Sequence, residues 1–328
     1  MNWELYWAVH SAGMAILSVS YHQVDWLERV PPNLLSLNFL VLASRKLGCY
    51  GKVLRDSGGK GTAAAAAAAA AERESEGLGV RVLRQIEGAT VPKRWFWIFY
   101  VIGTCANSWV LAGPRWRGTK NVGLCSWLVQ VQVMRRLYES LVVSRPSMSA
   151  RMHVLHLILG ASYYVAVPLT VAHCGGSGGY LKSAKETMEA PWWFPRTLTG
   201  RQSAWFAFAF FLFASYEQYE SHRILGALRR PEKLRLATSD SADGEGKDKA
   251  YLIPRGGWFD LVSCPHYFFE VVIYASLAVL AHKRGPMLLL LLFVTIELSF
   301  SATTQHAWYR AKFRRYPKRR RAIFPYIF

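Results

Sequence analysis

The sequence predicts an all-α membrane protein that crosses the bilayer seven times. Of the 328 residues, 52% are hydrophobic, yet the chain carries 40 Lys and Arg against 21 Asp and Glu. Apolar and basic residues must therefore occupy separate blocks, as they do in polytopic membrane proteins. The apolar blocks are also long enough, because a bilayer core about 30 Å thick requires roughly 20 helical residues.

Seven apolar stretches have the length of a membrane span. They are residues 5–22, 95–113, 122–143, 152–173, 204–225, 265–282 and 287–306. The stretch 34–48 turns basic at Arg45 and Lys46, so we predict an interfacial or re-entrant segment there. Glu4 precedes the first span, and neither a basic n-region nor an A-x-A site accompanies it. We therefore do not expect a removable signal peptide.

The distribution of basic residues predicts the orientation, since Lys and Arg are retained on the cytoplasmic side. With the N-terminus outside, the cytosolic segments carry 28 Lys and Arg and the opposite loops carry 9. Counting 34–48 as an additional span would place the basic stretch 52–94 outside. We therefore expect seven spans with a cytosolic C-terminus.

Composition also divides the chain near residue 90. Residues 58–88 contain an alanine run followed by Glu and Arg, with no apolar face to bury, which predicts a low-complexity cytosolic loop. We expect residues 1–90 to form an N-terminal span plus this variable loop, and residues 91–328 to form the main membrane domain. The polar segment 235–251 predicts a flexible link within that domain.

Several classes of function have no support in the sequence. No GxGxxG, GxxxxGK[ST] or HExxH motif is present, which argues against a Rossmann domain, a P-loop or a zincin. Five cysteines without CxxC spacing predict neither a disulfide framework nor a metal site. The net charge of +19 suits anionic lipid and an anionic cofactor better than nucleic acid, because no zinc-finger or RNA-binding signature accompanies it. The sequence indicates no obligate protein partner.

Polar residues inside the predicted spans carry the functional signal, since each costs about 2.5–3.5 kcal/mol at a helix centre unless it is paired or hydrated. Glu139 follows Arg135 by four residues and Arg136 by three, which puts them on one helical stripe. An internal salt bridge and a contact with cofactor or substrate both explain that stripe. Gln218 and His222 likewise share a helical face, with a hydrated boundary as the alternative.

A second stripe opens the span at 265–282. His266, Glu270 and Tyr274 follow one another at four-residue intervals, and Pro265 before them suits the first turn of a helix. Helix N-termini bind anions, and a glutamate accepts hydrogen bonds from amide or ribose donors. The combination favours a binding site over a single structural histidine.

A third group lies at the end of the last span. His306 and Tyr309 face the same way there, before a basic run. This run could anchor the chain on anionic lipid or neutralise a phosphate-rich cofactor. Its members are Arg310, Lys312, Arg314, Arg315, Lys318, Arg319, Arg320 and Arg321.

Several of these segments resemble the steroid 5α-reductase family of membrane NADPH-dependent ene-reductases. The C-terminal ones are "IPRGGWFDLVSCPHYFFE", "HAWY" and "YPKRRRAIFPYIF". The segments "VPKRWFWIFYVIG", "RRLYESLVVS", "SCPHY" and "QYESHRILGALR" are similar to the polyprenol reductase branch of that family. The resemblance extends over residues 91–328, apart from the 235–250 link, and implies that this region is the catalytic domain.

The resemblance implies a seven-helix enzyme of the endoplasmic reticulum membrane. It would use NADPH to reduce the α-isoprene double bond of polyprenol, giving dolichol for protein N-glycosylation. Leu252 stands where a cofactor-binding arginine often precedes the "IP" pair, so either Arg255 takes over that phosphate contact or the contact is lost. By position, the NADPH pocket carries over onto Gln218, His222, Arg229, Tyr251, His266, Tyr267, Glu270, Tyr274, His306 and Tyr309.

The catalytic residues follow less directly from the resemblance. Where steroid reductases have an acidic residue in the second span, this chain has Val101 beside Tyr100, and their catalytic tyrosine falls near Arg136. The candidate catalytic residues are Tyr100, Arg136, Glu139 and Tyr309. Hydride adds readily to an enal because charge develops on the carbonyl oxygen, and an allylic alcohol has no such oxygen. We therefore hypothesise that polyprenal is reduced, with Tyr100, Arg136 or Tyr309 donating to its oxygen.

Other functions stay open at this point. The chain could reduce a steroid enone or an enoyl-CoA thioester, or could be a membrane methyltransferase. Dependence on NADPH separates the reductases from the methyltransferase. A lipid-binding scaffold without turnover is the non-enzymatic alternative. For an isoprenoid tail we expect an apolar groove between aromatic spans such as "WFAFAFFLFASY", open to the lipid.

Overall fold

The structure, a computed structural model, describes residues 89–113, 120–144, 146, 150–174, 200–229, 251–281 and 284–327. The larger of its two compact units takes in 97–144 and 161–327 of this described chain, and the smaller one takes in 89–96 and 146–160. The predicted span 5–22, the segment 34–48, the loop 58–88 and nearly all of the link 235–251 lie outside the described residues. These features and the division near residue 90 therefore stay predictions.

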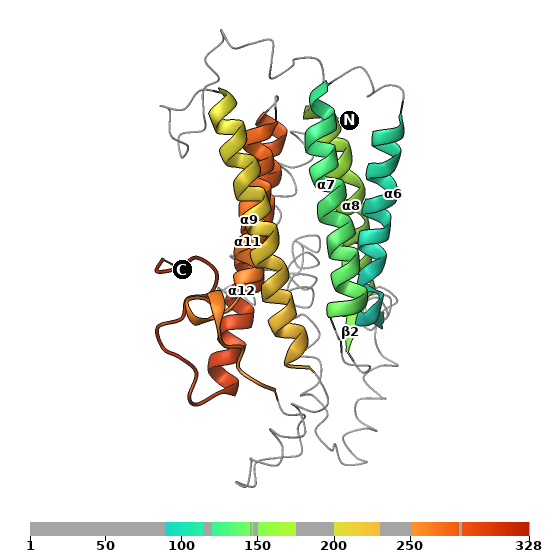
Figure 1. Ribbon diagram of the computed structural model, residues 1–328. Helices are drawn as coiled ribbons and strands as arrows, with labels where there is room; N and C mark the ends of the chain where they lie inside the picture. Colours follow the sequence, from blue (N-terminus) through green and yellow to red (C-terminus); the bar gives the residue numbers. More distant parts are fainter. Residues whose placement is uncertain are drawn as a thin grey trace, which may run out of the picture. The chain divides into compact units, whose positions relative to one another are not determined.

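Each predicted span from 95–113 onward coincides with a helix (Figure 1). The last one continues past the predicted end at residue 306, because no proline or glycine interrupts the chain before Lys312. The helices are α6 (Trp97–Ala112), α7 (Lys120–Tyr138), α8 (Val154–Cys174), α9 (Gly200–Ala227), α11 (Pro265–Leu280) and α12 (Arg284–Lys312).

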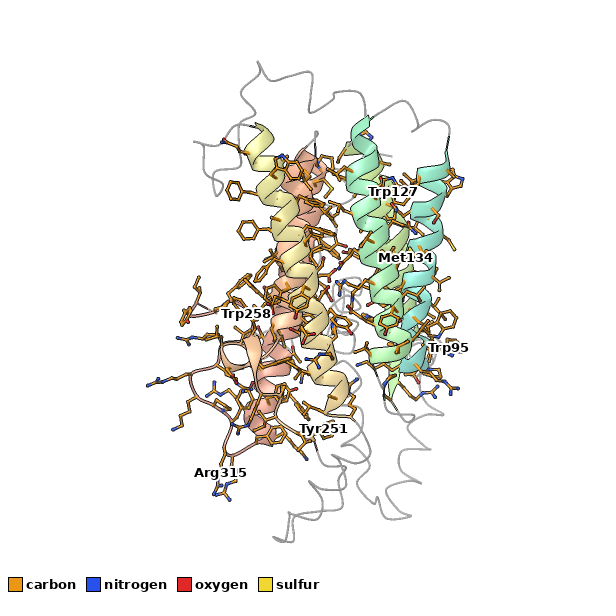
Figure 2. The ribbon with its side chains drawn as sticks, viewed as in Figure 1. Trp95, Trp127, Met134, Tyr251, Trp258 and Arg315 are labelled. Carbon is orange, nitrogen blue, oxygen red and sulfur yellow. The ribbon has the colours of Figure 1, made fainter. Side chains whose placement is uncertain are left out.

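Three helices in the described part of the chain are long and apolar enough to cross a membrane. They run over Lys93–Ala112, His156–Cys174 and Gly285–Lys312, while the apolar helix Pro265–Leu280 is shorter. Large apolar side chains on outer faces are exposed, and Figure 2 shows two of them, Trp127 and Met134, along α7. Such surfaces are rare in water, so the protein is membrane-embedded.

The core of the larger unit lies where α9, α11 and α12 pack together and meet α7 and α8. Phe211, Ile273, Leu277 and Leu290 are fully or almost fully buried within it. α11 is the central element, because it contacts both α9 and α12. Its first turn begins at Pro265, as predicted, where a missing N–H costs nothing.

A π-helical turn ends α7 and was not predicted. This turn, η3 (Glu139–Val143), is closed by a hydrogen bond from the Ser144 N–H to the Glu139 carbonyl at 2.6 Å. Gly226 on α9 lets the two segments approach, since a Cβ at that position would lie 2.3 Å from the Val143 carbonyl oxygen. π-Turns often mark functional sites, and this one begins at a candidate site residue.

The smaller unit contains a short antiparallel ribbon, which the sequence did not predict, within a described chain that is otherwise mostly helical. β1 (Thr90–Pro92) pairs with β2 (Arg151–His153), and the short 3-10 helix η2 (Lys93–Phe96) follows β1. Strands of three residues are too short to show the alternating pattern that predicts a strand. The opposed pairs are Thr90 with His153, Val91 with Met152 and Pro92 with Arg151.

The basic C-terminal segment is folded back onto the start of α11 rather than extended. Arg321 and Val262 form a parallel bridge, and the Cys264 N–H donates to the Ala322 carbonyl at 3.1 Å. Arg315 is exposed and labelled on this segment in Figure 2, whereas Arg320 is only 3% exposed. A purely surface-bound basic tail would not bury one of its arginines, so the segment is part of the folded domain.

Candidate active site

A buried carboxylate forms the centre of the candidate site. The Glu139 side chain is fully buried at the end of α7, and Arg135 and Arg136 both form salt bridges with it. His222 on α9 lies with its Nδ1 atom 2.8 Å from Glu139 Oε2 and 2.9 Å from Arg136 Nη1. The neutral ring can donate to Glu139 in one tautomer and accept from Arg136 in the other. The predicted ion pairs of Arg135 and Arg136 with Glu139 are thus present, and His222 connects them to α9.

Arg136 also reaches α6. Its Nη2 atom donates a hydrogen bond to the Tyr100 hydroxyl at 2.8 Å, and the guanidinium carbon lies 5.1 Å from the centre of that ring. Tyr100 is only 1% exposed. A cation this close strengthens the hydrogen bonds that a tyrosine hydroxyl can donate, since the surrounding dielectric is low.

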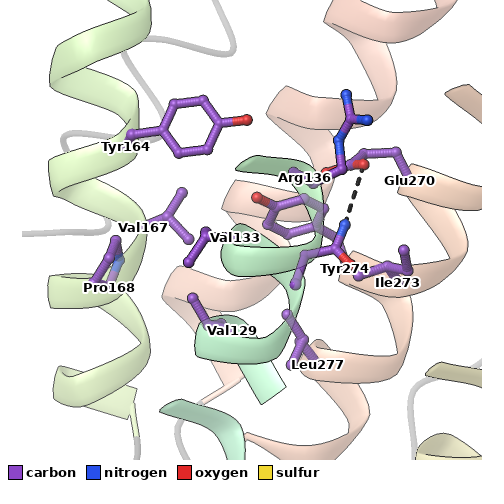
Figure 3. A pocket seen from close by; sticks show the side chains of 11 residues that line it. Val129, Val133, Arg136, Tyr164, Val167, Pro168, Glu270, Ile273, Tyr274 and Leu277 are labelled. Atoms are coloured by element: carbon purple, nitrogen blue, oxygen red, sulfur yellow. Dashed lines mark hydrogen bonds between the residues drawn. The ribbon is translucent and has the colours of Figure 1, made fainter. Parts of the chain in front are cut away.

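Two glutamines carry the network on to α11. Gln132 Nε2 donates to Gln218 Oε1 at 3.1 Å and to Glu270 Oε2 at 3.4 Å, the latter drawn as a dashed line in Figure 3. Gln218 in turn donates to Glu270 and, at 3.1 Å, to the backbone carbonyl of His266. Arg135 donates to both glutamines. The polar side chains of α7, α9 and α11 therefore form one connected network.

The predicted stripe on α11 lies along this network. His266 stands beside His222, with ring centres 5.3 Å apart, and packs against Tyr267 at 4.2 Å. Two turns further along, the Tyr274 hydroxyl accepts a hydrogen bond from Tyr163 on α8 at 2.6 Å. The structure brings all these residues together, while their roles stay predictions.

A narrow pocket opens between α7, α8 and α11 at this point (Figure 3). One part of its wall is polar and consists of Gln132, Arg136, Tyr164, Glu270 and Tyr274. The other part is apolar and consists of Val129, Val133, Val167, Pro168, Ile273 and Leu277. The division suits a ligand with one polar end on a hydrocarbon body.

His306 and Tyr309 belong to a different cluster, at the C-terminal end of α12. The Ser263 hydroxyl lies 2.6 Å from His306 Nδ1 and 2.6 Å from the Tyr316 hydroxyl. Tyr309 stacks on Tyr316, with ring centres 5.4 Å apart. Tyr309 is therefore placed with the folded C-terminal segment rather than with the Arg136 network.

The remaining predicted residues lie toward the surface. Tyr251 is 45% exposed and packs edge-on against Trp308 at 5.2 Å. Arg255 is exposed in the segment before the short 3-10 helix η4 (Gly257–Asp260), and Arg229 is exposed just after α9. The structure does not bring Tyr251 or Arg255 to the pocket wall.

Sequence reasoning missed several members of these clusters. Gln132 precedes Arg136 by four residues, so helical spacing could have placed it on the same face. Tyr164, Ser263 and Tyr316 carried no comparable signal, because single hydroxyl groups in apolar helices and loops are common. Contacts between distant segments bring them to the site.

Comparison with known proteins identifies the family. Residues 170–328 match the family model described as 3-oxo-5-alpha-steroid 4-dehydrogenase. Polyprenal reductase 1 of Arabidopsis thaliana is 31% identical over 278 residues, which cover 73% of this chain and 82% of that protein. The chain belongs to the steroid 5α-reductase family. The resemblance inferred from the sequence is thereby confirmed.

Other relatives in the steroid 5α-reductase family differ in how much of their length is matched. Polyprenal reductase 1 of Oryza sativa subsp. indica is 36% identical over 217 residues, or 61% of this chain and 57% of that protein. Polyprenal reductase of Caenorhabditis elegans is 28% identical over 272 residues, or 74% of this chain and 81% of that protein. The match thus spans less than two thirds of the rice protein.

Members of the steroid 5α-reductase family are in general NADPH-dependent oxidoreductases, and buried polar atoms in this chain fit such a cofactor. His266 Nδ1, Arg320 Nε and Arg320 Nη1 are buried with no hydrogen-bond partner among the described residues. Leaving a buried polar atom unsatisfied costs about 1–3 kcal/mol. A dinucleotide offers the phosphate, ribose and amide groups that would satisfy them.

Proposed function

We propose that the protein is a polyprenal reductase. It would reduce the α-isoprene double bond of polyprenal, the aldehyde of polyprenol, on the route to dolichol for protein N-glycosylation. The observation that carries this proposal is the 31% identity with Polyprenal reductase 1 of Arabidopsis thaliana over 82% of that protein. The relatives' names support the aldehyde rather than the alcohol as the species reduced.

The pocket supports the same substrate class. Its apolar wall suits the isoprenoid body, and its polar wall contains Arg136, Tyr164 and Tyr274, whose cationic and hydroxyl groups suit an aldehyde oxygen. Reduction adds a hydride to the β carbon and a proton to the α carbon, so the double bond is lost and the aldehyde is kept. The oxygen carries negative charge in between, which donors with a nearby cation stabilise.

The cofactor of the proposed reaction is NADPH, which supplies the hydride when bound. His222, His266 and Glu270 would hold its polar groups from the Arg136 network. His306, Tyr309 and Arg320 would hold its charged end from the C-terminal cluster. Gln218 keeps the His266 end of α11 in place by donating to its backbone carbonyl.

The proposed location follows from the charge distribution and the family. We infer a multi-pass protein of the endoplasmic reticulum membrane with seven spans and a cytosolic C-terminus. In that orientation the basic run from Arg310 to Arg321 faces the cytosol, which contains NADPH. Labelling an introduced C-terminal cysteine in sealed microsomes tests this topology, and protection from a membrane-impermeant reagent would contradict it.

The activity test uses the full-length protein purified in detergent with NADPH. We expect turnover of polyprenal and none of pure polyprenol in the absence of an oxidising partner. Efficient reduction of the alcohol alone would contradict the aldehyde assignment. A steroid enone is the second substrate to include, because the family model carries a steroid dehydrogenase description, and faster turnover of that substrate would replace the proposal.

A scaffold without turnover makes the opposite prediction for two site variants. We expect Glu270→Gln and His306→Ala to lose complementation of a dolichol-dependent glycosylation defect. Arg223→Gln serves as the control, because Arg223 is exposed and forms its salt bridge with Glu220 on the same helix. Full complementation by both site variants at normal protein levels would support a scaffold instead.

A further inference from the structure

The pocket contains a hydroxyl group to which sequence reasoning gave no role. Tyr164 reaches it from α8, opposite Glu270 on α11 and near Arg136 on α7 (Figure 3). Tyr100, the tyrosine that accepts the hydrogen bond from Arg136, is 1% exposed and lies behind the pocket wall rather than in it. A group that binds the substrate oxygen must be able to touch it.

We infer that Tyr164 is the catalytic residue whose hydroxyl donates a hydrogen bond to the carbonyl oxygen of the substrate. The inference rests on the proposed function and names a donor within it. Tyr100 then acts behind Tyr164 as a positioning residue rather than as a direct substrate contact, while Arg136 in the pocket wall supplies positive charge.

The connection to Arg136 supports this role. The Tyr164 ring packs edge-on against that of Tyr100, which accepts a hydrogen bond from Arg136 Nη2 at 2.8 Å. A chain of contacts therefore joins the pocket tyrosine to a partly buried cation, which itself lines the pocket. Negative charge that develops on a substrate oxygen beside Tyr164 is stabilised through this chain, and the low dielectric of the buried site increases the effect.

The ring of Tyr164 is held in place on several sides. It packs edge-on against Tyr100 at 5.2 Å and against Tyr163 at 5.3 Å, and lies parallel to Phe99 at 6.0 Å. Gly103 on α6 makes room for it, since a Cβ there would lie 2.8 Å from Tyr164 Cδ1. A donor fixed before the substrate binds needs no reorganisation during the reaction, which is what oxyanion stabilisation requires.

α8 is also irregular at this residue. Pro168 lies inside the helix and has no N–H, so it cannot donate to the carbonyl of Tyr164, four residues earlier. Pro168 and Tyr164 both line the pocket. The missing backbone hydrogen bond of α8 therefore lies beside the pocket.

The other pocket hydroxyl is a weaker candidate for the same role. Tyr274 accepts its hydrogen bond from Tyr163, a neutral group, at 2.6 Å. It also lies one turn from the carboxylate of Glu270 on the same helix. A negative neighbour disfavours charge build-up on a substrate oxygen, whereas the chain from Tyr164 leads to a positive one.

The test compares purified full-length variants with NADPH and polyprenal. Tyr164→Phe removes only the hydroxyl, and we expect kcat to fall about 100-fold, as when one oxyanion donor is lost, with KM for polyprenal nearly unchanged. Gly103→Ala displaces the ring and should lower kcat about tenfold through the same contact. Tyr216→Phe is the control, because Tyr216 is 61% exposed on α9.

A double variant separates catalysis from packing. If Gly103→Ala acts by moving the hydroxyl, it should add little once Tyr164→Phe has removed that hydroxyl, and the double variant should match Tyr164→Phe alone. If the wild-type protein is active and the kcat of Tyr164→Phe stays within about threefold of the wild-type value, the inference is overturned and the proposed function stays intact. Fully additive losses would likewise overturn the inference. A wild-type protein that does not reduce polyprenal would overturn both.

Discussion

Arg136 on α7 donates a hydrogen bond to the Tyr100 hydroxyl on α6 at 2.8 Å, and its guanidinium lies over the same ring. The other terminal nitrogen of Arg136, Nη1, donates to Glu139 and lies 2.9 Å from His222 Nδ1 on α9. One planar cation thus connects three helices. A guanidinium can do this because its five donors point in fixed, divergent directions.

The first prediction concerns this geometry. Arg136→Lys keeps the charge but loses the planar fork, so it cannot hold Tyr100, Glu139 and His222 together. We expect kcat to fall about 10–100-fold, the equivalent of one lost charge-assisted hydrogen bond. NADPH oxidation with polyprenal measures it. Arg223→Lys, the same change at an exposed arginine, should have no effect, and equal losses in both variants would contradict the argument.

The second prediction concerns the buried carboxylate. Glu139→Gln leaves the partly buried cations Arg135 and Arg136 without their counter-charge. Breaking a fully buried pair in this way costs about 3–5 kcal/mol. A large drop in the thermal unfolding temperature in detergent is expected. Glu220→Gln removes an exposed carboxylate that pairs with Arg223 and should leave the unfolding temperature unchanged. Unchanged stability of Glu139→Gln would mean that the arginines find other partners.

The third prediction concerns the approach of α9 to η3. In Gly226→Ala the new Cβ would lie 2.3 Å from the Val143 carbonyl oxygen, a backbone atom that cannot rotate away. Separating the segments would also draw His222 away from Glu139, so both stability and kcat should fall, stability by about 3 kcal/mol, the upper end of the usual cost of overpacking.

Gly256→Ala provides the contrast. Gly256 has φ +87°, but among the residues that the structure describes no atom lies within 4 Å of an added Cβ. The cost there is backbone strain alone, about 1–3 kcal/mol, because φ +87° with ψ +155° is a conformation essentially restricted to glycine, and activity should be retained. Thermal unfolding and turnover measured on both variants check this, and a milder effect at Gly226 would show that α9 can shift without loss.

The fourth prediction tests the C-terminal cluster. Arg320 is 3% exposed, has two nitrogens without hydrogen-bond partners among the described residues, and lies over the Tyr316 ring at 5.4 Å. If those nitrogens bind a phosphate, Arg320→Gln should raise KM for NADPH about tenfold or more and leave KM for polyprenal unchanged.

Exposed Arg319 supplies the matched control for that experiment. Arg319→Gln should leave both KM values unchanged. A lower unfolding temperature for Arg320→Gln with an unchanged KM for NADPH would instead assign Arg320 to the packing of the folded C-terminal segment.

Helical spacing was enough to anticipate part of the site. The four-residue intervals between His266, Glu270 and Tyr274, and between Arg135 and Glu139, depend only on the pitch of one helix. The structure has each stripe on one continuous helical segment, α7 with η3 and α11, while the roles of these residues stay predictions. The short ribbon at Thr90–Pro92 and the π-turn at Glu139–Val143 could not be anticipated, because three to five residues carry too little pattern.

The sequence by itself determined where the helices lie, which of their faces are polar, and the family to which the chain belongs. Only the tertiary structure decided that Tyr164 enters the pocket while Tyr100 lies behind it, and that Tyr309 belongs to a separate cluster. The physical reason is that periodicity describes one helix at a time. Which helix faces another depends on close contacts between distant residues, such as Gly103 with Tyr164 and Gly226 with Val143.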